Sequence, residues 1–237
     1  MYPWHHIHAT VDDRKAAALW HVQQSKAKRN EPSPRSENLY YGPNLLQFQT
    51  EAVAKQPKKA SIDSIGLSTQ NLPEMASVWS AADGMILSQG EEASNVLDPW
   101  GVAFELVEAD DPGQSHLNIS TDDPESLLSW YIANLGGERC KCPWDTNRSG
   151  LKFDTMTLFF QESKFRKHEH PWGPIDHIGW LTEDLDESYK LLTASDTKFI
   201  VQPREFGLVR LAFIVDPCGI LIELVEPPKG MNLKPDY

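Results

Sequence analysis

One stretch near the C-terminus decides the fold: residues 213–224, which read Phe-Ile-Val-Asp-Pro-Cys-Gly-Ile-Leu-Ile-Glu-Leu. Two apolar runs flank Asp-Pro-Cys-Gly, a composition that predicts a turn between two strands. Upstream, residues 175–182 have the apolar content of a buried strand, and residues 184–194 carry apolar side chains at helical spacing. Two further strands are predicted at 198–202 and 208–215, so this segment has the order β-α-β-β-β.

The same order is predicted three more times, in copies that open at residues 6–11, 62–68 and 116–121. Four pairs of landmark residues stand between 110 and 118 positions apart: His6 and His116, Gln47 and Phe159, Ser64 and His177, Glu105 and Glu223. Such regular spacing indicates two homologous halves. We therefore expect an α+β fold of four βαβββ modules, in which the two modules of each half pair into one open cup. The polar segment 25–41 is predicted to be mostly loop.

Side chains on the opening and closing strands of a cup should converge at its centre. In the second half these are His116, Phe159, His177 and Glu223. Burying a carboxylate in an apolar strand is costly unless it is paired or bound to a cation, and two imidazoles with one carboxylate hold a divalent transition metal. The sequence thus predicts metal ligands at His116, His177 and Glu223. The alternative is a hydrogen-bonded core glutamate with two incidental histidines.

The first half has His6, Gln47, Ser64 and Glu105 at the same four positions, with His8 on the same strand face as His6. Serine and glutamine are poor ligands for such a metal. We therefore expect this half to be a degenerate cup and the metal to lie in the second half alone.

These motifs resemble the vicinal oxygen chelate superfamily, which includes glyoxalase I, type I extradiol dioxygenases, methylmalonyl-CoA epimerase and the fosfomycin and bleomycin resistance proteins. The residues that carry the resemblance are 175–179, 213–224 and 98–106. It covers nearly the whole chain and implies two tandem glyoxalase-like domains, residues 1–110 and 111–237. By likeness to the dioxygenases, the second domain would hold the metal through His116, His177 and Glu223.

The chain departs from known members at informative places. Phe159 stands where glyoxalase I has a fourth, carboxylate ligand. The dioxygenases carry a catalytic histidine near the position of Thr155 or Met156, and a tyrosine at the position of Phe213. The remaining acid/base candidates are His168 and His170, in a segment that would otherwise be a solvated, charged linker.

The resemblance implies a metal-dependent enzyme that acts on a small oxygenated molecule, with Fe(II) favoured and Mn, Zn, Ni or Co as alternatives. Dioxygenase-like cleavage of a ring or a C–C bond is slightly preferred to lyase or isomerase chemistry of the glyoxalase or epimerase type. A third reading is a binding protein that sequesters a small molecule without chemistry.

Composition limits the partners. Lys and Arg number 22 against 34 Asp and Glu, a formal charge of −12, which repels phosphate backbones and anionic lipid. No apolar run approaches the roughly 18 residues of a membrane span, and no apolar leader is visible. Three cysteines (Cys140, Cys142 and Cys218) provide no disulfide framework. We expect a cytoplasmic protein whose partner is a small-molecule substrate, with a homodimer as one option, and neither nucleic acid nor membrane.

Overall fold

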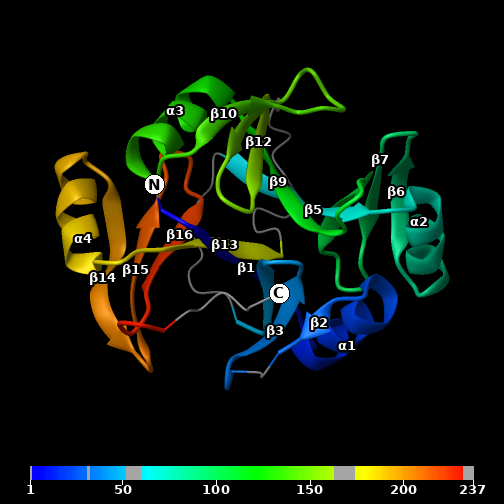
Figure 1. Ribbon diagram of the computed structural model, residues 1–237, viewed down its shortest axis with the longest axis horizontal. Helices are drawn as coiled ribbons and strands as arrows, with labels where there is room; N and C mark the ends of the chain where they lie inside the picture. Colours follow the sequence, from blue (N-terminus) through cyan, green and yellow to red (C-terminus); the bar gives the residue numbers. More distant parts are fainter. Residues whose placement is uncertain (1, 31–32, 52–59, 163–173, 232–237) are drawn as a thin grey trace.

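The computed structural model describes residues 2–30, 33–51, 60–162 and 174–231, and its elements repeat the order β-α-β-β-β four times (Figure 1). The first two modules comprise β1 (Trp4–Thr10), α1 (Arg14–Ser25), β2 (Lys28–Arg29), β3 (Ser36–Tyr41), β4 (Asn44–Gln49), β5 (Ala60–Thr69), α2 (Leu72–Ala81), β6 (Met85–Gln89), β7 (Ala93–Leu97) and β8 (Ala103–Glu108). The last two comprise β9 (Gly113–Thr121), α3 (Pro124–Asn134), β10 (Glu138–Lys141), β11 (Ser149–Lys152), β12 (Thr157–Glu162), β13 (Ile175–Leu181), α4 (Leu185–Ala194), β14 (Lys198–Phe206), β15 (Val209–Val215) and β16 (Leu221–Glu226). The expected α+β fold of four modules is confirmed.

The strands form two eight-stranded mixed sheets. Sheet A has the order β14-β15-β16-β13-β1-β4-β3-β2, and sheet B has the order β10-β11-β12-β9-β5-β8-β7-β6. At the middle of each sheet two opening strands pair antiparallel, β1 with β13 and β5 with β9. Each opening strand also pairs in parallel with the closing strand of its own module. Sheet A therefore joins the first and fourth modules, and sheet B joins the second and third.

This pairing differs from the one expected from the sequence. Each sheet contains strands from both sides of residue 110, so neither cup coincides with residues 1–110 or 111–237. Linker lengths give a physical reason, because short connections join neighbouring elements. Only residues 109–112 separate β8 from β9, which keeps the second and third modules in one sheet, whereas the longer stretches 50–59 and 163–174 lead from one sheet to the other.

The helices begin where the opening strands end, and each is capped by Asp or Asn. Asp13, Asn71, Asp123 and Asp184 accept hydrogen bonds from the first free amides of α1 to α4, which stabilises a helix start. The helices lie at the periphery of the molecule (Figure 1). The core beneath them includes the fully buried Trp4, Trp79 and Trp180. No helix within the described ranges is long and apolar enough to cross a membrane.

Part of the segment predicted as loop forms a strand instead. In β3 the buried Leu39 and Tyr41 alternate with the half-buried Asn38 and Tyr40. This is the period-two pattern of a strand with one face on the core. Most of the Lys, Pro, Ser and Arg residues that suggested a loop precede β3. The face that carries Asn38 and Tyr40 lines the cup of sheet A, where Gln47 donates a hydrogen bond to Asn38.

Two aspartates in equivalent turns fasten a helix of one module to the next module. Asp216 Oδ1 accepts from the amides of Cys218 and Ile220 at 2.9 and 2.8 Å, and its Oδ2 accepts from the Tyr131 hydroxyl of α3 at 3.1 Å. Asp98 lies 3.1 Å from His21 of α1 in the same way. Both carboxylates are buried, so these contacts between modules are shielded from water.

Asp216→Ala is expected to lower the free energy of unfolding by about 2–4 kcal/mol, because it leaves a buried hydroxyl and two amides without acceptors. Urea denaturation measures this. The control is Leu191→Ala on α4, whose side chain is 59% exposed and whose loss should change stability by no more than about 0.5 kcal/mol. Equal effects of the two substitutions would show that Asp216 does not fasten the modules.

Candidate metal centre

Three imidazoles and one carboxylate meet at the centre of sheet A. His6 and His8 come from β1, His177 from β13 and Glu223 from β16, and one donor atom of each lies within 4.8 Å of the others. Glu223 Oε2 is 3.0 Å from His6 Nε2 and 3.2 Å from His177 Nε2, and the two nitrogens are 3.4 Å apart. His6, His177 and Glu223 are all buried.

Strand register explains why these side chains share a face. Gly179 on β13 is the partner of His6 on one side and of Glu223 on the other, and His177 is the partner of His8. Partners across neighbouring strands point to the same face of a sheet. A Cβ at Gly179 would overlap the His6 imidazole, so glycine lets that ring lie across β13 towards Glu223.

A bulge supplies the outer support of His177. The register of β13 against β1 shifts so that Asp176 is an extra residue, and a bulge re-aims side chains. Asp176 Oδ2 lies 2.7 Å from His177 Nδ1 and accepts from Gln49 Nε2 at 3.2 Å. Such a carboxylate directs the other ring nitrogen towards a metal. Asp176 was not among the site residues predicted from the sequence, although an acid directly before a ligand histidine is a usable signal.

The protonation states suit a cation. Burial lowers the pKa of His6 and, more strongly, that of His8, so both rings are neutral. Burial would raise the pKa of Glu223, but hydrogen bonds from His177 and His6 outweigh it and hold the pKa well below the usual range. Burial likewise opposes protonation of His177, yet its bonds to Asp176 and Glu223 raise its pKa. Neutral imidazoles and an ionised carboxylate are the forms that bind metals, so only His177 would release a proton.

The donor spacing fits one ion. With ligands about 2.1 Å from a metal, neighbouring ligands lie about 3.0 Å apart in an octahedron and about 3.4 Å apart in a tetrahedron. The three separations among His6, His177 and Glu223 run from 3.0 to 3.4 Å. His8 stacks on His177 with ring centroids 4.2 Å apart. Its buried Nδ1 has no hydrogen-bond partner among the described residues, so His8 is available to the metal or to a molecule bound there.

The structure brings together two of the three predicted ligands, His177 and Glu223. It places His116 on β9 of sheet B, with Nε2 2.8 Å from Glu105 Oε2, and His6 stands in its place. The correction follows from module pairing: His6 and His116 occupy equivalent positions, but the first module, not the third, joins the fourth. The acid/base candidates His168 and His170 lie outside the described residues.

The degenerate set expected in the first half is also divided. His6, His8 and Gln47 lie in sheet A, where Gln47 is the register partner of His8. Ser64 and Glu105 lie in sheet B. Each cup is therefore built from both halves of the chain.

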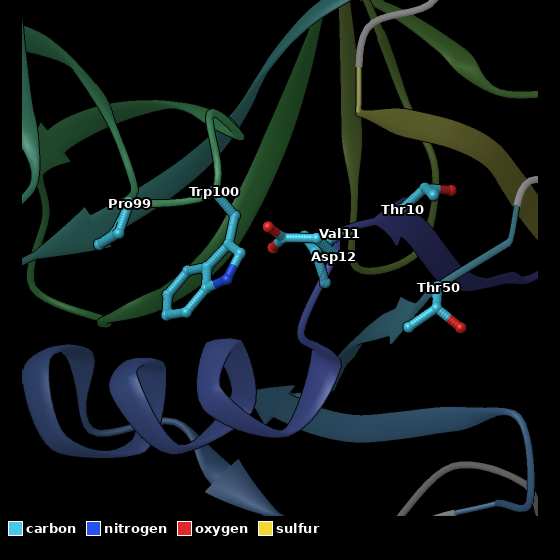
Figure 2. A pocket seen from close by; sticks show the side chains of 6 residues that line it. All are labelled: Thr10, Val11, Asp12, Thr50, Pro99 and Trp100. Atoms are coloured by element: carbon cyan, nitrogen blue, oxygen red, sulfur yellow. The ribbon is translucent and has the colours of Figure 1, made fainter.

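A separate hollow lies at the carboxyl end of β1, beside the start of α1. Its volume is about 510 Å³, and its lining residues are Thr10, Val11, Asp12, Thr50, Pro99 and Trp100 (Figure 2). None of the clustered His and Glu side chains lines it. It is a crevice between the first two modules.

Comparison with known proteins bears on the fold. No family model and no curated protein sequence matches the chain. Glyoxalase I from Zea mays superposes with a TM-score of 0.73 at 16% identity, covering 95% of this chain and 92% of that one. A candidate dioxygenase from Bacillus subtilis superposes with a TM-score of 0.71 at 15% identity, covering 97% and 86%. The fold is that of the tandem glyoxalase-like proteins. The resemblance seen in the sequence is confirmed at this level, and the glyoxalase-like fold by itself leaves the reaction open.

Gly179→Ala should weaken divalent-metal binding at least about tenfold, because the added methyl pushes His6 away from Glu223. Gly66→Ala is the matched control, since a Cβ at Gly66 would overlap His116 in sheet B. It should disturb packing equally and leave metal affinity within about twofold. Calorimetric titration with Co(II) compares the two variants. Equal losses of affinity would refute the role assigned to Gly179.

Proposed function

We propose that the chain is a divalent-metal-dependent enzyme of the vicinal oxygen chelate type, which acts on a small oxygenated molecule at His6, His177 and Glu223. The observation that carries this proposal is the spacing of their donor atoms, which suits neighbouring ligands of one ion. A bound divalent ion would stabilise negative charge that develops on a substrate oxygen. Three protein donors leave part of the coordination sphere free for a substrate.

The chain's own residues prepare the site for this chemistry. Asp176 holds His177 in one orientation through Nδ1, which fixes the ring nitrogen that faces the cluster. His8 lies on the same face of β1 as His6, and its buried Nδ1 has no hydrogen-bond partner in the part of the chain that the structure describes. We assign to His8 a contact with the substrate. Its ring would donate or accept a hydrogen bond at a substrate oxygen, from which position it could transfer a proton.

The two walls of the cup orient the substrate. On one side Leu211, Phe213 and Leu221 form a buried apolar cluster, and the Phe213 ring meets His177 edge-on at 5.2 Å. On the other side Gln47 donates to Asn38 at 2.8 Å. A molecule whose adjacent oxygens face the histidines and Glu223 would place its apolar part against Phe213. Its polar part would lie against the side-chain amides of Gln47 and Asn38. This arrangement favours a substrate with an aromatic or aliphatic group beside its paired oxygens.

Oxidative cleavage with Fe(II) is our first choice of reaction, because two histidines and one carboxylate with open positions are the donor set of non-haem Fe(II) oxygenases. Lyase or isomerase chemistry is the alternative, and the stacked His8 favours it by offering a base at the substrate side. Sequestration of a small molecule without chemistry would use the same apolar wall and would need no metal. Stoichiometric metal therefore separates the enzyme from the binding protein.

The purified protein is expected to hold one divalent metal per chain, which mass spectrometry of metal content would measure. His6→Ala and Glu223→Gln should each reduce the metal content to near zero, because each removes a donor. His116→Ala and Glu105→Gln are the matched pair in sheet B and should leave it near one. Metal retained in the Glu223 variant and lost in the Glu105 variant would show that the wrong cup had been assigned.

Phe213→Ala should reduce the preference for apolar substrates. Within pairs of catechols or α-hydroxy ketones that differ by one phenyl or methyl group, we expect kcat/KM of the metal-loaded enzyme to favour the more apolar member. The substitution should shrink that ratio about tenfold, the scale on which a hydrophobic pocket discriminates. Phe206→Ala, at a side chain that is 43% exposed, should leave the ratio unchanged. An unaltered ratio in the Phe213 variant would contradict this orientation of the substrate.

A further inference from the structure

Sheet B repeats the geometry of sheet A with different side chains. In its register Gly66 lies between His116 and Glu105, as Gly179 lies between His6 and Glu223. Ser64 stands opposite Asn118, where sheet A has His177 opposite His8. One imidazole and the carboxylate are thus retained, and two imidazoles are replaced by neutral polar groups.

The outer supports of a metal site are also retained in sheet B. A register shift makes Asp63 an extra residue just before Ser64, as Asp176 is before His177. Asp63 accepts hydrogen bonds from Ser120 and from Gln161, and Gln161 matches Gln49 of sheet A. A second shift leaves Ser115 beside His116, with its hydroxyl 2.9 Å from His116 Nδ1. The residues that would support a metal ligand at position 64 are therefore present, but position 64 itself is a serine.

A guanidinium occupies the centre of this cup. Arg148, directly before β11, places Nη1 2.9 Å from both oxygens of Glu105 and 2.9 Å from Asn118 Oδ1. Asp145 steadies it, with Oδ2 3.0 Å from Nε. Glu105 is only 1% exposed and also accepts from Trp144 Nε1 at 3.3 Å.

Glu105 is ionised, and the Arg148 guanidinium is its compensating charge. Burial would raise its pKa, but the hydrogen bond from His116, with further contributions from Asn118 and Arg148, lowers it to about 2. A buried carboxylate without a compensating charge is strongly destabilising. In sheet A the clustered imidazoles face the carboxylate, whereas in sheet B a covalently attached cation does.

We infer that the Arg148 guanidinium takes the place of a divalent cation in the cup of sheet B and keeps that cup free of metal. Nη1 stands in contact with three oxygen atoms that would otherwise face an ion. A second cation there would have to approach the guanidinium closely, which Coulomb repulsion opposes in a buried site. Arg148 is thus the residue that restricts the chain to a single metal centre, and the missing imidazole at position 64 is a second barrier.

Two variants separate the barriers. Ser64→His restores a donor at the position equivalent to His177 and leaves Arg148 in place, so it should bind as much Co(II) per chain as the wild type. Ser64→His/Arg148→Met also removes the guanidinium while keeping its apolar volume, and it should bind one Co(II) per chain more than Ser64→His alone. Equilibrium dialysis with metal analysis gives both values. An extra metal in Ser64→His, or none in the folded double variant, would overturn the inference.

A stability cycle tests the same inference if the double variant does not fold. Arg148→Met should lower Tm more than Arg148→Met/Glu105→Gln does, because the second change removes the carboxylate that lost its cation. Additive losses of Tm would show that Arg148 is not the counter-charge of Glu105. Both tests compare variants within sheet B. They therefore give an answer whether or not the wild type holds a metal in sheet A, and a failure of the proposed function is seen separately as a wild type without metal.

Discussion

The burial of a carboxylate at the centre of each sheet is the constraint on which the rest of the structure depends. Glu223 is 8% exposed and Glu105 1% exposed, and both lie in closing strands whose other residues are largely apolar. Removing an ionised carboxylate from water is costly unless an opposite charge or several donors compensate for it. Glycine on the neighbouring strand, an imidazole laid across it and a bulge that supports a residue facing the cup all arrange donors around the buried oxygens.

The two cups meet this constraint in two ways. In sheet A, His6 and His177 converge on one oxygen of Glu223 at distances that suit the ligands of one ion. In sheet B, Arg148 contacts both oxygens of Glu105 and makes an ion unnecessary. A metal can leave and return, and it leaves coordination positions open to other molecules. A guanidinium is covalently attached, and Arg148 donates its hydrogen bonds to Glu105 and Asn118 instead of to a substrate. We therefore expect chemistry in sheet A only.

Much of this arrangement can be predicted from the sequence, because periodicity and spacing report local structure. The four modules, the turn at Asp216 and the buried acids Glu105 and Glu223 follow from apolar runs with one charge inside them. His177 follows from its place in a strand. The pairing of modules does not follow, since four equivalent modules can pair in more than one way and the choice depends on linkers and tertiary contacts. His116 was expected beside His177 for that reason, and His6 lies there instead.

Residues that act from loops and bulges were the hardest to predict. Arg148 directly precedes β11, the strand next to the edge of sheet B, and contacts Glu105, which is 43 positions away in the sequence. Helical and strand periodicity relate only residues that are close in sequence, so they do not predict this contact. Asp176 acts because a bulge turns it towards His177, and a regular strand would have pointed it to the opposite face. Asn38, which accepts a hydrogen bond from Gln47, lies in the segment 25–41, whose composition indicated a loop. In each case the deciding contact is tertiary.

The most direct test of the account is the position of the metal. Crystals grown with Co(II) and measured at the cobalt absorption edge would give an anomalous difference map that locates every bound ion. The account predicts one strong peak, within coordination distance of His6, His177 and Glu223, and no peak beside Glu105 and His116. A peak at Glu105 and His116, or no peak at Glu223 in a fully folded protein, would contradict it.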